Sequence, residues 1–228
     1  MKNYYTLILA GVALAATATA SQAAEPLKVQ VGAASEYTGK GLGKSDGNTA
    51  AFGSVRWNVG KGFYLNAFAS EAASSKGADA EVILSGGYER EFGDTSIDVM
   101  VMHRKLTGET NGVDSAYWEY QADVSRDFGK RFSGRLRVNY SSEAYGSADE
   151  AWWVEAQGSF KITSADKLTV AYAQRRLDRG VEYDAWNIGV KHKFSKAVSG
   201  DLRWYDTDGH EFGERYEGRL VAQLAVNF

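Results

Sequence analysis

A short glycine- and lysine-rich stretch at residues 37–47, YTGKGLGKSDG, has the residue types of a phosphate-binding loop. In a Walker A loop, G-x-x-x-x-G-K-[ST], backbone amides and the lysine surround the phosphates, and a helix follows. Here Gly43, Lys44 and Ser45 match the end of that pattern, but the position of the first glycine is occupied by Thr38. The next residues, AFGSVRWNV, have the pattern of a strand. Spacing and context therefore exclude a nucleotide site.

Histidines, serines and one acidic turn are the other candidates for chemistry. A hydrolase would need a serine hydrogen-bonded to a histidine, with a third group that orients the ring. His103, His192 and His210 are far apart, and Ser141 lies on a different segment from His103. The acidic turn DTDG at residues 206–209 lacks the remaining ligands of a calcium loop. We predict no enzyme activity, no cofactor and no metal, with a lipid hydrolase as the least favoured alternative.

The first residues indicate export. Lys2 precedes an apolar run at residues 7–20, and Ser21, Gln22 and Ala23 form a signal-peptidase type of site. We predict a signal peptide at residues 1–23 and a single domain at 24–228; a membrane anchor would need a longer apolar run. The sequence has no cysteine, which excludes disulfides, and its net charge of −3 does not favour nucleic acid.

Apolar and polar residues alternate along the rest of the chain with a period of two. In one segment, Leu136 and Val138 alternate with Arg135 and Arg137. No later apolar run approaches the ~20 residues of a transmembrane helix, but a transmembrane barrel alternates lipid-facing and lumen-facing residues and has no such run. The expected strands are 28–37, 50–59, 62–71, 79–91, 94–104, 115–128, 131–141, 151–162, 167–176, 182–194, 197–206 and 216–228.

The connections between these segments alternate in length. They are short after the even-numbered segments and mostly longer and more polar after the odd-numbered ones, as in outer-membrane barrels with short periplasmic turns and longer external loops. We therefore predict an all-β fold: a transmembrane, antiparallel, up-and-down β-barrel of about twelve strands in the cell outer membrane. A soluble β-sandwich or a lipocalin-like barrel remains an alternative.

The last segment, YEGRLVAQLAVNF, has one uninterrupted apolar or small face that starts at Tyr216 and ends at Phe228. A last strand that ends in an aromatic residue resembles the signal by which outer-membrane proteins are recognised for assembly. We predict that Tyr216 and Phe228 belong to such a signal and that the barrel-assembly machinery is a partner.

The polar face of the alternation carries charges of both signs, which in a pore tune which solutes pass. Cross-strand ion pairs are the alternative role, and they would narrow the lumen. We expect passive transport of small polar solutes without strong ion preference; a closed barrel with a structural or surface-interaction role is the rival. The expected pore-lining residues are Arg56, Glu119, Asp123, Arg135, Arg137, Glu155, Lys191, Asp201, Arg203 and Arg219.

The glycine-rich stretch then becomes the first external loop. Its glycines allow positive φ angles in a tight excursion. We expect Lys40, Lys44 and Asp46 at the external mouth, where the lysines would contact lipopolysaccharide of the outer-membrane lipid or an incoming solute.

The sequence also resembles a known family. The run EYTGKGLGKSDGNTAAFGSVRW, followed by GFYLNAFAS, looks like the opening of the TorF-type porins, a conserved proteobacterial family. Tyr37, Gly41 and Ser45 match its first-loop motif, whereas Lys40 replaces an arginine and Thr49 a proline. A later match, YDAWNIGVKHKFSKAVSGDLRWYDTDG, extends the resemblance over essentially the whole chain after the signal peptide. The resemblance implies a porin without an established substrate.

Overall fold

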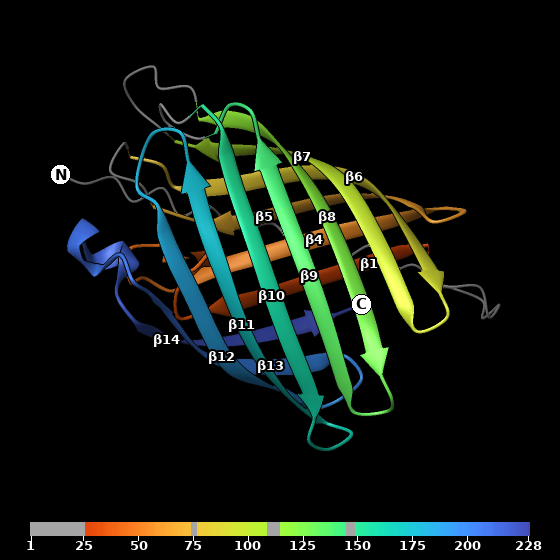
Figure 1. Cartoon of the computed structure of the whole chain (residues 1–228). Helices are drawn as coiled ribbons and strands as arrows, with labels where there is room; N and C mark the ends of the chain where they lie inside the picture. Colours follow the sequence, from red (N-terminus) through yellow and green to blue (C-terminus); the bar gives the residue numbers. More distant parts are fainter. Residues whose placement is uncertain (1–25, 74–76, 109–114, 145–148) are drawn as a thin grey trace.

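Twelve long antiparallel strands form a closed barrel (Figure 1). This computed structural model describes residues 26–73, 77–108, 115–144 and 149–228, so the predicted signal peptide lies outside the described residues. The barrel strands are β1 (Leu27–Ala34), β4 (Ala50–Gly60), β5 (Phe63–Glu71), β6 (Ala80–Phe92), β7 (Thr95–Thr107), β8 (Ala116–Phe128), β9 (Phe132–Ser141), β10 (Ala151–Lys161), β11 (Asp166–Leu177), β12 (Tyr183–Lys193), β13 (Val198–Thr207) and β14 (Arg219–Asn227).

Each barrel strand pairs with its neighbour along the barrel, and β1 closes the sheet by pairing with both β4 and β14. The closing register aligns Val31 with Val226 and with Gly53. Closure matters because a barrel in lipid has no water to satisfy the free backbone groups of an edge strand. The predicted fold and number of barrel strands are confirmed.

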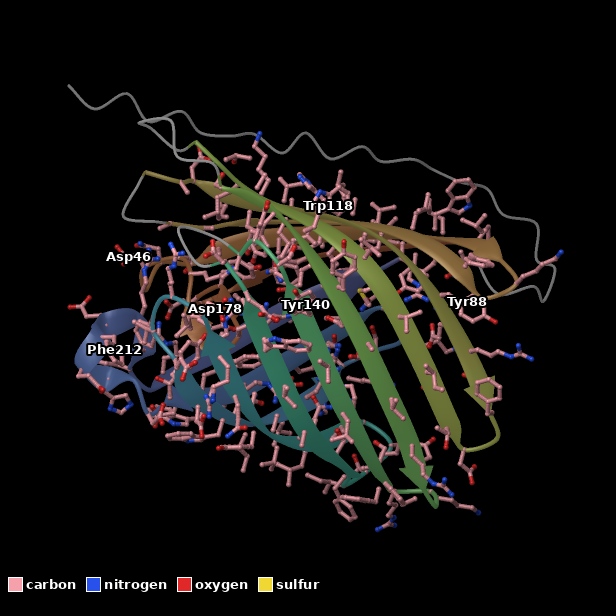
Figure 2. All side chains as sticks on the ribbon, turned by 45° about the horizontal axis from the view of Figure 1, so that its top comes forward. Asp46, Tyr88, Trp118, Tyr140, Asp178 and Phe212 are labelled. Atoms are coloured by element: carbon pink, nitrogen blue, oxygen red, sulfur yellow. The ribbon has the colours of Figure 1, made fainter. Side chains whose placement is uncertain are left out.

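The two ends of the barrel differ, as the connection lengths predicted. At one end, the turn end, tight connections follow β4, β6 and β8, and Gly60, Gly93 and Gly129 adopt positive φ there. The other end, the loop end, carries the longer connections, including residues 35–49 and 208–218. Figure 2 shows Asp46, Asp178 and Phe212 at the loop end, and Tyr88 lies toward the turn end.

The burial pattern is the reverse of that of a water-soluble protein. Along β8, Tyr120 and Val124 are 48% and 45% exposed on the outer surface. Glu119 and Gln121, the two residues on either side of Tyr120, face the interior and are only 1% and 9% exposed. Apolar side chains cover the outside in the same way on other strands, so the barrel's outer surface suits hydrocarbon and its interior is polar.

The structure corrects the ends of the first and last predicted strands. β1 ends at Ala34 and not at residue 37, because the following loop turns into the barrel. β14 begins at Arg219, so Tyr216 is not part of the last strand. It belongs to one of two short 3-10 helices, η1 (His210–Phe212) and η2 (Glu214–Tyr216). No helix in the described ranges has the length and apolarity to cross a membrane.

The apolar outer face leads to a prediction that tests whether this surface lies in lipid. Leu136 lies midway along β9 and is 61% exposed. We expect Leu136→Arg to reduce the free energy of unfolding of the vesicle-inserted barrel by about 2–4 kcal/mol, because a cation at the bilayer midplane is poorly solvated. Urea titration of the vesicle-inserted barrel, followed by heat-modifiable migration, measures this change. Leu136→Ala controls for the lost side chain. Equal stability of the two variants would contradict a lipid-facing surface.

Candidate functional site

The loop after β1 folds back into the barrel as a small hairpin. Its strands are β2 (Thr38–Gly39) and β3 (Leu42–Gly43), and Gly39 pairs with Leu42. The two residues between them, Lys40 and Gly41, have φ angles of 53° and 81°. Positive φ at both central positions is what a two-residue type I′ hairpin turn requires. The glycine-rich sequence therefore forms a compact turn that carries a lysine at its tip.

Two lysines of this loop form ion pairs with buried carboxylates of the barrel wall. Lys40 pairs with Glu119 on β8, and the Lys44 ammonium lies 2.7 Å from Glu81 on β6. Arg104, on the intervening strand β7, donates to Glu81 at 2.9 Å and to Glu119 at 3.2 Å. These five side chains are called the ionic cluster below. Three cations and two carboxylates alternate, so no carboxylate in it is left unpaired.

Neutral donors complete the coordination of the two carboxylates. The Tyr37 hydroxyl donates to Glu81 at 2.6 Å, and the Asn139 amide donates to Glu119 at 2.9 Å. Burial, with the Glu81 carboxylate as a further cause, raises the pKa of Tyr37 well above its usual value. The phenol therefore keeps its proton and remains a hydrogen-bond donor.

The opposite side of the hairpin packs on an apolar part of the lumen. Leu42 contacts a buried cluster that includes Trp153 on β10 with Tyr183 and Ala185 on β12. The Tyr183 hydroxyl also donates to the Lys40 carbonyl at 2.9 Å. The hairpin thus bridges the lumen between an ionic wall, on β6–β8, and an aromatic wall, on β10–β12.

A second turn fixes the base of the loop at the loop end of the barrel. Arg219, at the start of β14, donates to Glu36 at 2.8 Å, and Glu36 also accepts from the Gly47 amide at 3.2 Å. The Ser45 hydroxyl accepts from the Tyr37 amide at 2.9 Å. Asp46, between these contacts, is exposed with a φ of 57°. Of the three residues predicted at the external mouth, only Asp46 is therefore exposed; the lysines are turned into the barrel.

The hairpin separates two cavities inside the barrel. An inner cavity of about 490 Å³ extends from the hairpin toward the turn end, and an outer cavity of about 360 Å³ lies toward the loop end. Gly39, Lys40 and Arg104 line both. A solute that moves from one cavity to the other must therefore pass the lysine tip of the hairpin.

Six of the ten residues predicted to line a pore lie on the inner cavity. The cross-strand ion pairs considered for them also exist: Arg137 lies 2.6 Å from Asp123, and Arg135 pairs with Glu155. The six that line the cavity are Arg135, Arg137, Glu155, Lys191, Asp201 and Arg203.

The other four have different surroundings. Asp123 lies behind its partner Arg137, and Glu119 is enclosed in the ionic cluster. Arg219 supports the base of the loop. Arg56 stacks over the Tyr64 ring at 3.6 Å and pairs with Glu89 at 2.8 Å, outside the lining of the cavity.

Sequence reasoning missed two cations that line the inner cavity, Arg104 and Lys167. The period-two pattern contains the signal for both. Arg104 follows the outward-facing His103, and Lys167 precedes Leu168, so each falls on the inward parity of its strand. With Lys40, the cavity lining holds seven cations against the carboxylates of Glu155 and Asp201. Five of these cations form ion pairs, some with carboxylates outside the lining, so among the described residues Lys167 and Lys191 are the lining cations without an ion-pair partner.

The three histidines and Ser141 each have other partners within the part of the chain that the structure describes. The His103 ring packs edge-on against Trp118 at 4.9 Å, whereas the Ser141 hydroxyl donates to the Trp118 carbonyl. His192 and His210 each contact one aspartate at the surface. Across the described ranges, no group of three His, Asp or Glu residues is placed to hold a metal ion.

Comparison with protein families identifies the chain. Residues 17–225 match a family described as a bacterial protein of unknown function, Gcw_chp. The chain belongs to this family. Among curated protein sequences, none matches significantly.

Solved structures with the same fold are outer-membrane porins and channels. The KdgM porin in complex with disordered oligogalacturonate superposes with a TM-score of 0.60 at 8% identity, over 89% of this chain and 97% of that one. The NanC porin gives 0.59 at 9% identity, over 89% and 98%. An outer-membrane channel from Pseudomonas putida F1 gives 0.50 at 11% identity, over 89% and 93%. At these identities, the likeness shows the shared barrel fold.

The buried position of Lys40 generates a prediction about pH. Burial lowers the pKa of Lys40 to about 7, although the Glu119 carboxylate opposes this effect. A released hairpin, with its lysine in water, would bind a proton up to about pH 10.4. The released state thus holds more protons between these values, so docking of the hairpin becomes more favourable as pH rises from 7 to 10.

An NMR titration of ¹³Cε-labelled lysine in micelles measures this property. We expect one resonance, absent from the spectrum of Lys40→Met, to titrate near pH 7. Free lysine, which titrates near pH 10.4, provides the reference. Titration of the Lys40 resonance above pH 10 would contradict a buried, docked side chain.

Proposed function

We propose that the protein is an outer-membrane channel for passive transport of small polar solutes. The observation that carries this proposal is the pair of cavities, the inner one with a polar lining, which lie end to end within a barrel whose outer surface is apolar. A barrel with only a structural role has no need for such space in its lumen. The fold shared with porins supports the same function.

A specific observation favours one alternative, a closed barrel with a structural or surface-interaction role. The hairpin is held on both sides of the lumen, by the ionic cluster and by the Tyr183 contact. A docked hairpin therefore obstructs the path between the two cavities. The two functions differ in whether solutes pass the docked hairpin or only a displaced one.

The proposal includes a location and an orientation. The loop end would face outward, where the exposed Asp46 turn meets lipopolysaccharide, and the turn end would face the periplasm. Export would depend on the predicted signal peptide at residues 1–23. The barrel-assembly machinery would read the last strand and Phe228, which is exposed beside β1. Membership of the TorF-type porins, which the sequence resembles, is part of the same proposal.

Shortening the hairpin tests the channel directly. We expect low conductance from the wild-type barrel in planar bilayers. Replacement of residues 38–43 by two glycines should raise the single-channel conductance several-fold, because it joins the two cavities into one passage. A Lys40→Ala, Lys44→Ala double variant should give intermediate or flickering currents, because it leaves Leu42 and the turn backbone in place.

The matched control shortens a loop that lines only the outer cavity and leaves the docked hairpin, which limits passage, in place. Deletion of Asp178 and Arg179 from the exposed β11–β12 connection should leave the conductance unchanged. Heat-modifiable migration confirms that each variant is folded. Folded barrels that give no current, even without the hairpin, would overturn the channel proposal and favour the closed barrel.

A further inference from the structure

Three lysines form a row across the inside of the barrel near the turn end. Lys161 on β10 is directly opposite Lys167 on β11, and Lys167 is directly opposite Lys191 on β12. Directly opposed residues on neighbouring strands have Cβ atoms about 4.5–5.5 Å apart, and like charges there are destabilising. The outward neighbours of the row, Leu168 and Val190, confirm by alternation that it faces the lumen.

Local carboxylates do not neutralise this lysine row. Asp201 is directly opposite Lys191, but both of its oxygens accept hydrogen bonds from Arg203, each at 3.0 Å. Within the described residues, no ion pair forms between a carboxylate and any lysine of the row. The row therefore differs from Arg135, Arg137 and Arg203, each of which has a carboxylate partner.

The row borders the inner cavity, which has room for a small organic anion. Lys167 and Lys191 line the cavity together with Arg135 and Arg203. The Nε atom of Arg135 is buried and has no hydrogen-bond partner. That atom is enclosed by protein, so a solute in the cavity does not reach it, and Lys167 and Lys191 supply the positive charge that faces this part of the cavity.

We propose that the lysine row is a binding site for a small solute that carries one or more carboxylates. This inference rests on the proposed channel function and adds its substrate class. The carboxylates of the solute would supply the negative charge that the wall lacks at the row. The site lies on the path between the hairpin and the turn end, so a bound anion would be held during passage. The channel would prefer anions, although the formal net charge of the whole chain is −3.

The lysine row differs from an ordinary solvated group of turn lysines in a measurable way. Lysines that are only solvated would repel one another, and their replacement would change stability slightly and equally with or without an anion. In both cases Lys167→Gln relieves repulsion and makes the ligand-free barrel more resistant to urea; only a binding site predicts an effect on the response to an anion. The same substitution should remove the stabilisation that citrate, used as a tricarboxylate probe, gives to the wild type.

Two measurements on the folded barrel test the proposal. The first is citrate binding by titration calorimetry, which does not need an open channel. The second is the reversal potential in a KCl gradient across a planar bilayer. We expect Lys167→Gln, Lys191→Gln to weaken citrate binding at least fivefold per lysine, the fold-change that corresponds to ~1 kcal/mol for a close charge pair in water. Lys167→Glu, Lys191→Glu should reverse the preference from chloride to potassium.

The matched control is Lys61→Gln, Lys130→Gln, which removes two exposed lysines from turns at the same end of the barrel. It should leave citrate affinity and reversal potential unchanged. Citrate binding that is lost in the row variant but accompanied by no current in any variant would support the site and overturn the channel. Current without anion preference, and without citrate binding, would support the channel and overturn the site. Equal effects in the row and control variants would also overturn the site, because they would indicate only general surface charge.

Discussion

The ionic cluster is the interaction on which the interior of this barrel depends. Glu81 and Glu119 are buried in the wall, and within the wall itself Arg104 is the one cation that pairs with them among the described residues. Arg104 alone leaves one negative charge uncompensated, and each carboxylate gains a cation of its own only when Lys40 and Lys44 of the loop are docked. Removal of one partner from a buried ion pair typically costs 3–5 kcal/mol, because a charge is left uncompensated. The wall and the hairpin therefore stabilise one another.

Docking of the hairpin gives the lumen its two unequal halves. Above the hairpin, loops tie to one another: the Ala73 amide donates to the Lys44 carbonyl, and Arg215 donates to the Ala73 carbonyl. Below it, the inner cavity extends toward the turn end, and its lining residues among those described lie on the strands and the hairpin. The outer surface does not divide the barrel into two halves in this way, because it is apolar along the strands on both sides of the hairpin. The asymmetry of the lumen thus comes from one short loop rather than from the strands.

The sequence predicts the barrel well because the patterns that indicate its strands and turns are local. Alternation, tight turns at Gly60, Gly93 and Gly129, and polar loops repeat along the chain, and each can be recognised within about twenty residues. The docked hairpin cannot be found in this way. Lys40 meets Glu119, which is 79 residues away, and the local sequence is equally compatible with a loop that projects into solvent. The same limit explains why Lys40 and Lys44 were expected at the external mouth, and why Tyr216 was assigned to the last strand.

The register of the strands separates two kinds of lumenal charge that the sequence alone presents as one. Arg135, Arg137 and Arg203 each have a carboxylate partner within the wall, so much of their charge is used in holding strands together. The lysines at 161, 167 and 191 oppose one another instead. Paired charges narrow a lumen and contribute little net potential, whereas unpaired charges of one sign create a field that a solute experiences. The selectivity of such a barrel is therefore decided less by how many charges face its interior than by which of them the neighbouring strand leaves uncompensated.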